Sequence, residues 1–276
     1  MRLAVALLLA TSLACDRPAA RRAAAAEAPV TGQWLWSARD SALLVDARQT
    51  LPALRAGVWV ATIDRRGSGP NEALVTSLGR PLDASVGADA ELVIRLDDSF
   101  TAAWRDVPAD SIAAWLELRL VRLLRVVERD GPRHVVQLDY DAPVSRLAGY
   151  AALLHRLRQP GHVLYGRPFW ITSLVAHLAD PEYGARFRPL VDGHIVQLFD
   201  TGDRYTPERA RDVMARVSRA AMPFRVGVGA FERRTASGPT THRAWFDVIP
   251  AAARSPWYRG MWIFPGGMEY HTYLPR

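Results

Sequence analysis

The sequence predicts an α/β protein of the (β/α)8 TIM-type barrel class, in an irregular rather than a perfect form. Eight short apolar runs rich in Val, Ile and Leu recur along the chain, and helical stretches separate several of them. This alternation favours parallel strands joined by right-handed crossovers. The stretch 33–276 has the usual size of such a barrel, which is roughly 250 residues. A hydrophobic fraction of 49% and a charged fraction of 23% fit an ordinary globular chain.

The expected strands are, in order, residues 33–37, 57–64, 91–98, 134–141, 169–174, 193–199, 224–231 and 260–264. The clearest helices are 111–129 with Asp110 as cap, 144–158 ending at a Gln-Pro-Gly breaker, and 206–221 with Thr206 as cap and Pro207 in first position. The first two connections are weakly patterned, which predicts the irregularity. A doubly wound open sheet is the alternative, but Gly227-Val228-Gly229 lies inside a strand and lacks the third glycine of a dinucleotide loop.

Residues 1–14 have the layout of a secretory signal, with Arg2 before a short apolar run and with small residues at the end. Cys15 follows at once and resembles the lipidation site of a bacterial lipoprotein, although Leu13 stands one place later than usual. Ordinary signal cleavage, which would release a soluble protein, is the alternative. Residues 15–32 are rich in Ala, Arg and Pro and predict a flexible tether. Residues 33–276 then form a single domain.

The net charge is +7, from 35 basic residues that are all Arg and 28 acidic residues. The arginines are scattered along the chain, whereas nucleic-acid binding favours a clustered stripe, so no nucleic-acid partner is expected. The seven histidines are dispersed and no HExxH motif occurs, which argues against a metal site. The chain also lacks a GxSxG elbow and a Walker loop, and Cys15 is its single cysteine, so neither a cofactor nor thiol catalysis is expected.

Polar side chains on the strands are the candidates for chemistry, because TIM-barrel active sites lie at the carboxyl ends of the strands. Alternation places Gln137, Asp139 and Asp141 on the inner face of one strand. Two carboxylates at i and i+2 lie about 6.5–7 Å apart at Cα, and each disfavours ionisation of the other. Further inward polar candidates are Arg95, Asp97 and Gln197, and the aromatic residues that could form a stacking floor for a sugar are Trp34, Trp36, Trp262 and Phe264.

Several of these residues also allow a structural interpretation. Asp141 precedes a helix and could be its cap. Arg95 could form a purely structural pair with Asp139 or with Asp97, which Gln197 would complete. Asp97 and Glu232 are the candidates for a base or nucleophile, although Glu232 is also consistent with a surface charge. Asp200 and Asp203 fit a solvated loop.

The segments VVQLDYDAPVSRLAGYAALLHRLR, ITSL, VDGHIVQLF and PFRVGVGAF resemble a bacterial domain family of unknown function. The resemblance covers Trp34 to Trp262 and implies a glycoside-hydrolase-like barrel. The acidic strand also resembles, more distantly, those of chitinase-type and muramidase-type barrels. Chitinase-type enzymes carry a string of acids that ends in a Glu proton donor, whereas here the string ends at Asp141 and Ala142 follows.

These patterns together predict an envelope-associated barrel that binds a carbohydrate and hydrolyses it by carboxylate chemistry. Asp141 is the expected general acid, with Asp139 orienting it or stabilising positive charge. The expected substrate-binding residues are Arg95, Asp97, Gln137, Gln197 and Trp262. A lipid anchor on Cys15 would hold the protein at a membrane, facing the periplasm. The alternative is a non-catalytic glycan-binding or scaffold protein on the same fold.

Overall fold

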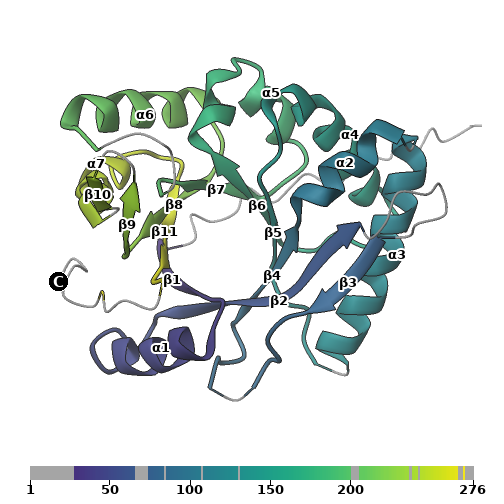
Figure 1. Cartoon of the computed structure of the whole chain (residues 1–276), viewed down its shortest axis with the longest axis horizontal. Helices are drawn as coiled ribbons and strands as arrows, with labels where there is room; N and C mark the ends of the chain where they lie inside the picture. The colour runs from purple at the N-terminus through teal and green to yellow at the C-terminus, as the bar shows by residue number, and fades with distance from the viewer. Residues whose placement is uncertain are drawn as a thin grey trace, which may run out of the picture.

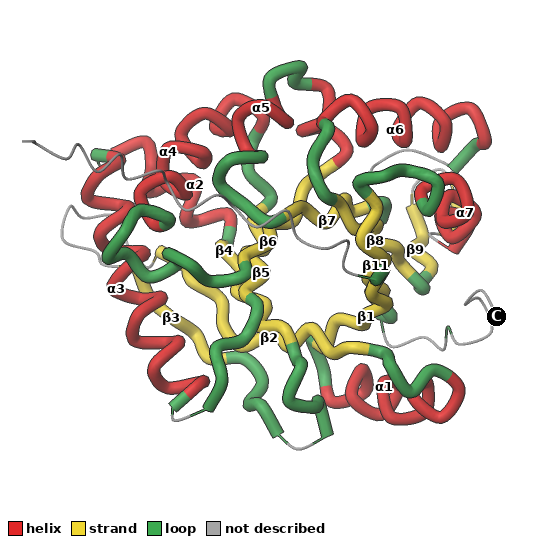
Figure 2. The backbone as a smooth tube through the Cα atoms, turned by 180° about the vertical axis from the view of Figure 1, so that it is seen from behind, coloured by secondary structure: helices red, strands yellow, loops and turns green. Residues whose placement is uncertain are grey.

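The computed structural model describes residues 28–65, 74–83, 85–106, 108–129, 131–199, 205–235, 238–241, 243–266 and 270. Within these ranges eight parallel strands form a closed ring with the helices outside it (Figures 1 and 2). These strands are β1 (Val30–Leu35), β2 (Arg55–Arg65), β4 (Glu91–Leu96), β5 (Val136–Tyr140), β6 (Phe169–Leu174), β7 (Gly193–Gln197), β8 (Phe224–Gly229) and β11 (Tyr258–Phe264). The predicted barrel class is confirmed, and each of the eight predicted strands is found.

The ring closes between the first and the last strand of the barrel. The order around it is β1-β11-β8-β7-β6-β5-β4-β2, and β1 pairs in parallel with both β11 and β2. In these pairings Gly32 lies opposite Trp262 on one side and Arg55 on the other. Strand β1 begins at Val30, so the barrel starts three residues before the predicted boundary at Gln33.

The helices and short 3-10 turns connect the strands on the outside of the ring. The helices are α1 (Ala38–Thr50), α2 (Asp98–Asp106), α3 (Ala109–Glu128), α4 (Leu147–Leu157), α5 (Tyr183–Phe187), α6 (Pro207–Ala220) and α7 (Ile249–Ala252). The 3-10 turns are η1 (Val144–Arg146), η2 (Val175–Ala179) and η3 (Arg243–Val248). None of the described helices is long and apolar enough to cross a membrane.

The irregularity lies in the second and seventh connections, and the sequence predicted it for the second of these only. A short strand, β3 (Leu74–Leu78), follows β2 in place of a helix and pairs antiparallel with the end of β2. After β8, the hairpin β9 (Glu232–Thr235) and β10 (Gly238–Thr241) precedes η3 and α7. The barrel is therefore closed, but its outer layer is incomplete where β2 leads into β3.

The helix starts follow local capping chemistry, with one correction. The Thr206 hydroxyl accepts a hydrogen bond from the Arg209 amide at the start of α6, which confirms the predicted cap. The prediction that Asp110 caps the third helix is wrong. Pro108 holds the cap position without a side-chain bond, and Asp110 lies in the first turn, where its carboxylate pairs with Arg156 at 3.0 Å.

The barrel interior is filled by large side chains rather than left as a pore. Its buried apolar residues are Trp34, Val93, Trp170, Ile195 and Trp262. Glycine makes room for them, because a Cβ on Gly57 would lie 2.5 Å from the Trp262 ring. The larger core lies between the outer face of the ring and the surrounding helices. The interior therefore closes the barrel beneath the carboxyl ends of the strands.

A buried polar network crosses the barrel near the amino ends of the strands, among the tryptophans. The Trp34 indole donates to Gln137 (2.7 Å), and the Gln137 amide donates to Glu91 (2.8 Å). Arg225 donates from one nitrogen to both Glu91 oxygens, at 2.8 and 2.9 Å. Its guanidinium also lies 3.9 Å from the centroid of the Trp170 ring. Glu91 and Arg225 are at most 2% exposed, so each compensates the charge that the other buries.

We expect the stability of the protein to fall as the pH drops below about 6.5, because of a buried histidine. His194 is fully buried beside Ser173 (2.8 Å). Burial, with a smaller effect from His177, lowers the pKa of His194 to about 3. Between these two values the unfolded chain binds a proton that the folded chain does not, which costs about 1.4 kcal/mol per pH unit. The unfolding free energy measured against pH should have a shallower slope in His194→Asn. The same slope in that variant, or an equal change in the exposed control His155→Gln, would contradict this assignment.

Candidate functional site

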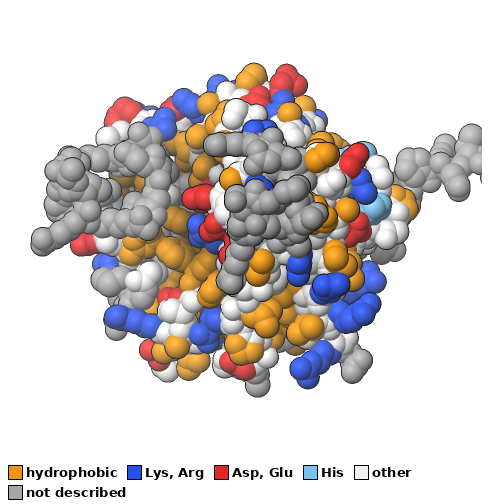
Figure 3. Space-filling model, turned by 45° about the vertical axis from the view of Figure 1, so that its right-hand side comes forward, with side chains coloured by type: hydrophobic (Ala, Val, Ile, Leu, Met, Phe, Trp, Pro, Cys, Tyr) orange, Lys and Arg blue, Asp and Glu red, His pale blue; other side chains and the backbone are white. Residues whose placement is uncertain are grey.

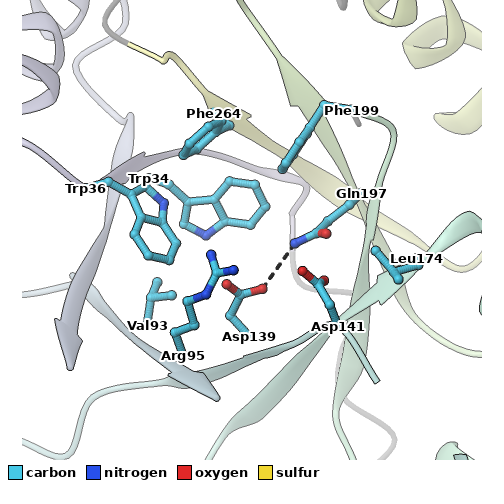
Figure 4. A pocket seen from close by; sticks show the side chains of 10 residues that line it. All are labelled: Trp34, Trp36, Val93, Arg95, Asp139, Asp141, Leu174, Gln197, Phe199 and Phe264. Carbon is cyan, nitrogen blue, oxygen red and sulfur yellow. Dashed lines mark hydrogen bonds between the residues drawn. The ribbon is translucent and has the colours of Figure 1, made fainter. Parts of the chain in front are cut away.

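A pocket of about 450 Å³ opens at the carboxyl ends of the strands, above the buried tryptophans. Polar and aromatic side chains from several strands converge on it (Figure 4). Its lining residues are Trp34, Trp36, Val93, Arg95, Asp139, Asp141, Leu174, Gln197, Phe199 and Phe264. This is the end of a TIM barrel where functional sites are built.

Strand β5 and the residue after it supply both carboxylates of the pocket. Alternation along β5 turns Asp139 inward on the strand and places Asp141 just beyond its end. Asp139 is 6% exposed, whereas Asp141 is exposed at the rim. Strand alternation predicted both residues on one face, and the structure brings both into the same pocket.

Asp139 lies among hydrogen-bond donors from neighbouring strands. One of its oxygens accepts from the Thr172 hydroxyl (2.9 Å) and from the Gln197 amide (3.1 Å), as the dashed line to Gln197 in Figure 4 indicates. Burial raises the pKa of the Asp139 carboxyl, while the positive charge of Arg95 and these hydrogen bonds oppose that effect. The carboxyl is thus held in one orientation and is easier to protonate than an exposed aspartate.

Arg95 links the acidic side of the pocket to its aromatic side. It is the register partner of Asp139 on the neighbouring strand β4, and in Figure 4 its guanidinium points toward Asp139. The same group lies 5.7 Å from the centroid of the Trp36 ring, which itself stacks on Trp59 at 5.4 Å. Arg95 therefore presents a fixed positive charge beside the carboxylates.

Aromatic rings form the wall opposite the carboxylates. Phe199 and Phe264 stack with their centroids 5.2 Å apart, and both meet the Trp34 ring edge-on. Trp36 completes the wall and meets Phe264 edge-on at 6.2 Å. Figure 4 shows these four rings on one side of the pocket and Arg95, Asp139, Asp141 and Gln197 on the other. Such a wall offers flat apolar faces to a ligand whose other side is polar.

The interpretation of Asp141 as a helix cap is wrong. The turn η1 has Pro143 at its cap position and no side-chain bond there. Asp141 instead lines the pocket, together with Leu174 from the neighbouring strand. Its carboxylate is therefore placed where it could contact a ligand in the pocket.

Three of the predicted substrate-binding residues do not line this pocket. Gln137 and Trp262 are fully buried beneath it, where Gln137 bonds Trp34 and Glu91, and Trp262 stacks on Trp34 at 5.9 Å. Asp97 accepts a hydrogen bond from the Ser99 amide (3.1 Å) at the start of α2, as a helix cap does. These side chains support the floor and the neighbouring helix rather than contacting the pocket.

The two residues considered as base or nucleophile are also absent from the lining. Asp97 is engaged at α2, and Glu232 is exposed on the hairpin strand β9. Asp200 and Asp203 lie outside the described residues. Among the residues that line the described pocket, the carboxylates are Asp139 and Asp141 alone.

Two contributors to the site were not identified from the sequence. Thr172 on β6 orients Asp139, and Phe199, two residues after Gln197, belongs to the aromatic wall. The period-two alternation of each strand contains the signal for both, since it turns each of them inward. Among the described residues, no group of three His, Cys, Asp or Glu side chains could hold a metal ion.

Comparisons with known proteins identify the fold of the chain. The spore cortex-lytic enzyme SleL of Bacillus megaterium QM B1551 has a TM-score of 0.56 and 11% identity, over 90% of this chain and 72% of that chain. Concanavalin B has a TM-score of 0.54 and 14% identity, over 88% and 97%. The xylanase and α-amylase inhibitor protein XAIP-I, solved in complex with trehalose, has 0.50 and 14%, over 88% and 94%.

These likenesses show that the chain has a TIM-barrel fold. At identities of 11–14% they show the fold and not the activity. No protein-family model and no curated protein matches the sequence. The resemblance to a bacterial family of unknown function therefore stays a prediction.

Proposed function

We propose that the protein binds a carbohydrate in the pocket at the carboxyl ends of its strands. One observation carries the proposal: an aromatic wall faces carboxylate, guanidinium and amide groups across a single pocket of about 450 Å³. A sugar ring has apolar C–H faces that pack on aromatic rings and hydroxyl groups that need polar partners at its edge. Trp36 and Phe264 would contact the face, and Asp141, Arg95 and Gln197 would bind the hydroxyls.

The fold neighbours support a carbohydrate ligand. SleL is described as a spore cortex-lytic enzyme, and the inhibitor protein was solved with the disaccharide trehalose. Their identity to this chain is low, so the ligand class is argued from the pocket itself.

We further propose that the pocket hydrolyses a glycosidic bond, with Asp141 as the general acid. The Asp141 carboxyl would give its proton to the glycosidic oxygen as the bond to the anomeric carbon breaks. Asp139 would stabilise the positive charge that develops on the sugar ring. Water would then add to the anomeric carbon and return a proton to Asp141, which restores the acid.

Binding without hydrolysis is the second candidate, and a specific observation favours it. Glycoside hydrolases of the usual kind place two carboxyl groups on either side of the scissile bond. Here Asp139 and Asp141 come from the same strand, and the described wall facing them is aromatic rather than acidic. A pocket of this kind would hold a sugar and leave its linkage intact.

A combined binding and turnover screen separates the two candidates. The full chain is incubated with peptidoglycan, chitin-type and glucan oligosaccharides, and its Asp139→Asn, Asp141→Asn double variant is run beside it. New reducing ends with the wild type alone would support hydrolysis. Saturable binding without cleavage would support the binding protein. Equal binding by the wild type and by Trp36→Ala would count against this pocket as the site.

The location of the protein is a separate part of the proposal. We propose that residues 1–14 are a secretory signal and that Cys15 carries lipid at the periplasmic side of the bacterial envelope. Multiple acyl chains would hold the barrel at a membrane, whereas a single chain gives only marginal binding. Loss of membrane fractionation in Cys15→Ser would support the anchor. Unchanged fractionation of that variant would favour a secreted soluble protein.

A further inference from the structure

We infer that a second pocket, at the amino ends of the strands, binds a phosphate-type oxyanion. This pocket has a volume of about 510 Å³ and lies at the opposite end of the barrel from the carbohydrate pocket. Its position follows from residues that directly precede barrel strands, namely Val135, Pro168, Asp192 and Pro223. It is independent of the function proposed above.

Guanidinium groups dominate the charged lining of this pocket. Five arginines line it, together with one carboxylate, and these residues are Arg55, Arg158, Arg167, Arg225, Arg259 and Asp192. They come from distant parts of the chain, because strand starts and the turns before them meet at this end of the barrel. Figure 3 shows one face of the molecule, on which blue side chains lie at several places and gather at the lower right.

Among the described residues, the carboxylates in ion pairs with these arginines are fewer than the five positive charges. Glu91 lies against Arg225 and Arg55, and Arg55 also approaches Asp89 at 3.4 Å. The other two pairs are Arg167 with Glu128 and Arg158 with Asp192. These are four carboxylates for five guanidinium groups. Of the four, Asp192 is the one that lines the pocket.

Of the five arginines that line the pocket, Arg259 is the one that has no carboxylate partner among the described residues. It is half-buried near the start of β11, and its guanidinium donates hydrogen bonds to the carbonyl oxygens of Pro256 and Tyr258. Both bonds use the same guanidinium nitrogen. The remaining N–H groups of Arg259 have no described partner, so its charge and donors are available to a ligand.

Two buried arginine nitrogens provide the second, independent observation. Arg225 is 1% exposed and Arg167 is 6% exposed, and the Nε atom of each has no hydrogen-bond partner among the described residues. A buried N–H without a partner is costly, and a charged one more so. Both residues line the pocket. A ligand with several acceptor oxygens in the pocket would lie beside these two guanidinium groups and add negative charge next to them.

A phosphate group fits these donors better than a single carboxylate does. Arginine forks bind phosphate through paired, charge-assisted hydrogen bonds, and several arginines can share its oxygens. The pocket is also larger than a phosphate ion, so it can accept a phosphate ester. The ligand class is therefore inorganic phosphate or an organic phosphate.

The position of the N-terminus suggests two sources for the phosphate. The described barrel begins at Val30, which is the register partner of Gly260, directly after Arg259. The chain therefore enters the barrel at the same end as this pocket. If Cys15 is lipidated as proposed, the anchor is attached to the chain on this side of the barrel, and phospholipid headgroups are one source of the phosphate. A small free phosphate compound is the other source.

Isothermal titration of the full chain at constant ionic strength tests the site. Inorganic phosphate represents the free anion, and glycerophosphoglycerol, a deacylated headgroup, represents the lipid source. Saturable binding of either supports the site, and the tighter ligand identifies the source. We expect Arg259→Gln to weaken binding by roughly tenfold, which corresponds to the loss of one charged hydrogen-bonding partner.

The control variant removes the same charge from outside the pocket. Arg254 is exposed, lies five residues before Arg259 and does not line the pocket. Arg254→Gln should bind as the wild type does. If neither phosphate compound binds saturably, or if Arg259→Gln binds as tightly as Arg254→Gln, the inference is wrong and the arginines serve the fold alone.

Discussion

Replacing Glu91 by Gln should lower the free energy of unfolding by about 3–5 kcal/mol, the usual cost of removing one partner from a buried ion pair. Glu91 is fully buried and accepts hydrogen bonds from Arg225 and Gln137. In the variant the Arg225 guanidinium stays inside the barrel, between Trp170 and Trp262, without its countercharge. The amide of Gln would also turn one acceptor into a donor, which would disturb the bond from Gln137.

Urea unfolding of the wild type and of Glu91→Gln measures this effect. The matched control is Glu208→Gln, which makes the same chemical change in an exposed pair with Arg211. An exposed pair contributes little, so the control should unfold as the wild type does. A double variant, Glu91→Gln with Arg225→Met, should recover part of the loss because it removes the unpaired charge as well. Equal stability of the wild type and Glu91→Gln would mean that the pair does not hold the barrel together.

The eight strands could be predicted because each is a short apolar run that is buried on both faces or nearly so. In a parallel barrel one face of a strand meets the helices and the other the interior, so runs such as Glu91–Leu96 differ clearly from the amphipathic helices between them. The first two connections could not be predicted. The second of them is the short strand β3, and its five residues depend on pairing with the end of β2.

Pairings across the barrel were beyond the sequence, although the side chains involved were not. Alternation turns Glu91 inward with Val93 and Arg95, and it turns Arg225 inward with Gly227. These patterns do not indicate that Glu91 and Arg225, 134 residues apart, meet each other. The contacts between inward residues depend on how far along the barrel axis each strand places them, which the register of the strands determines.

Depth also explains which site residues were predicted. Gln137 and Asp139 share one face of β5, yet Gln137 is fully buried beneath the pocket whereas Asp139 lines it. Asp97 and Asp141 both follow strand ends, yet Asp97 bonds the Ser99 amide of α2 while Asp141 lines the pocket. Sequence alternation assigns a face to each residue, and the register of neighbouring strands decides whether that residue reaches the mouth.

If the pocket hydrolyses a glycan, Asp141→Asn should lower turnover by about 10²–10⁴-fold, the usual contribution of a general acid. An amide cannot give a proton to the glycosidic oxygen, and Asp141 is exposed at the rim, so its replacement should leave the fold intact. Release of reducing ends under saturating glycan measures the effect. Asp97→Asn is the control, because it changes an aspartate at a strand end outside the pocket and should keep full turnover. Full turnover in Asp141→Asn would exclude it as the acid.

Asp139→Asn separates a functional carboxylate from a structural one, because stability and activity should respond differently. The Asn oxygen can still accept from Thr172 and Gln197, so both hydrogen bonds can persist. Burial raises the pKa of Asp139, so the folded chain binds its proton more tightly than the unfolded chain does. Above that raised pKa the ionised carboxylate therefore lowers the free energy of unfolding. This destabilisation becomes smaller as the pH falls toward the ordinary pKa of about 3.9.

The Asn variant should accordingly be at least as stable as the wild type at neutral pH, and its advantage should shrink in acid. Thermal unfolding at neutral and at acidic pH measures both parts of this expectation. Loss of turnover or of glycan affinity with no loss of stability would mean that the Asp139 carboxylate serves the ligand. Functional groups often lower the stability of the fold in this way. Loss of stability at neutral pH together with unchanged ligand binding would instead make Asp139 the structural partner of Arg95.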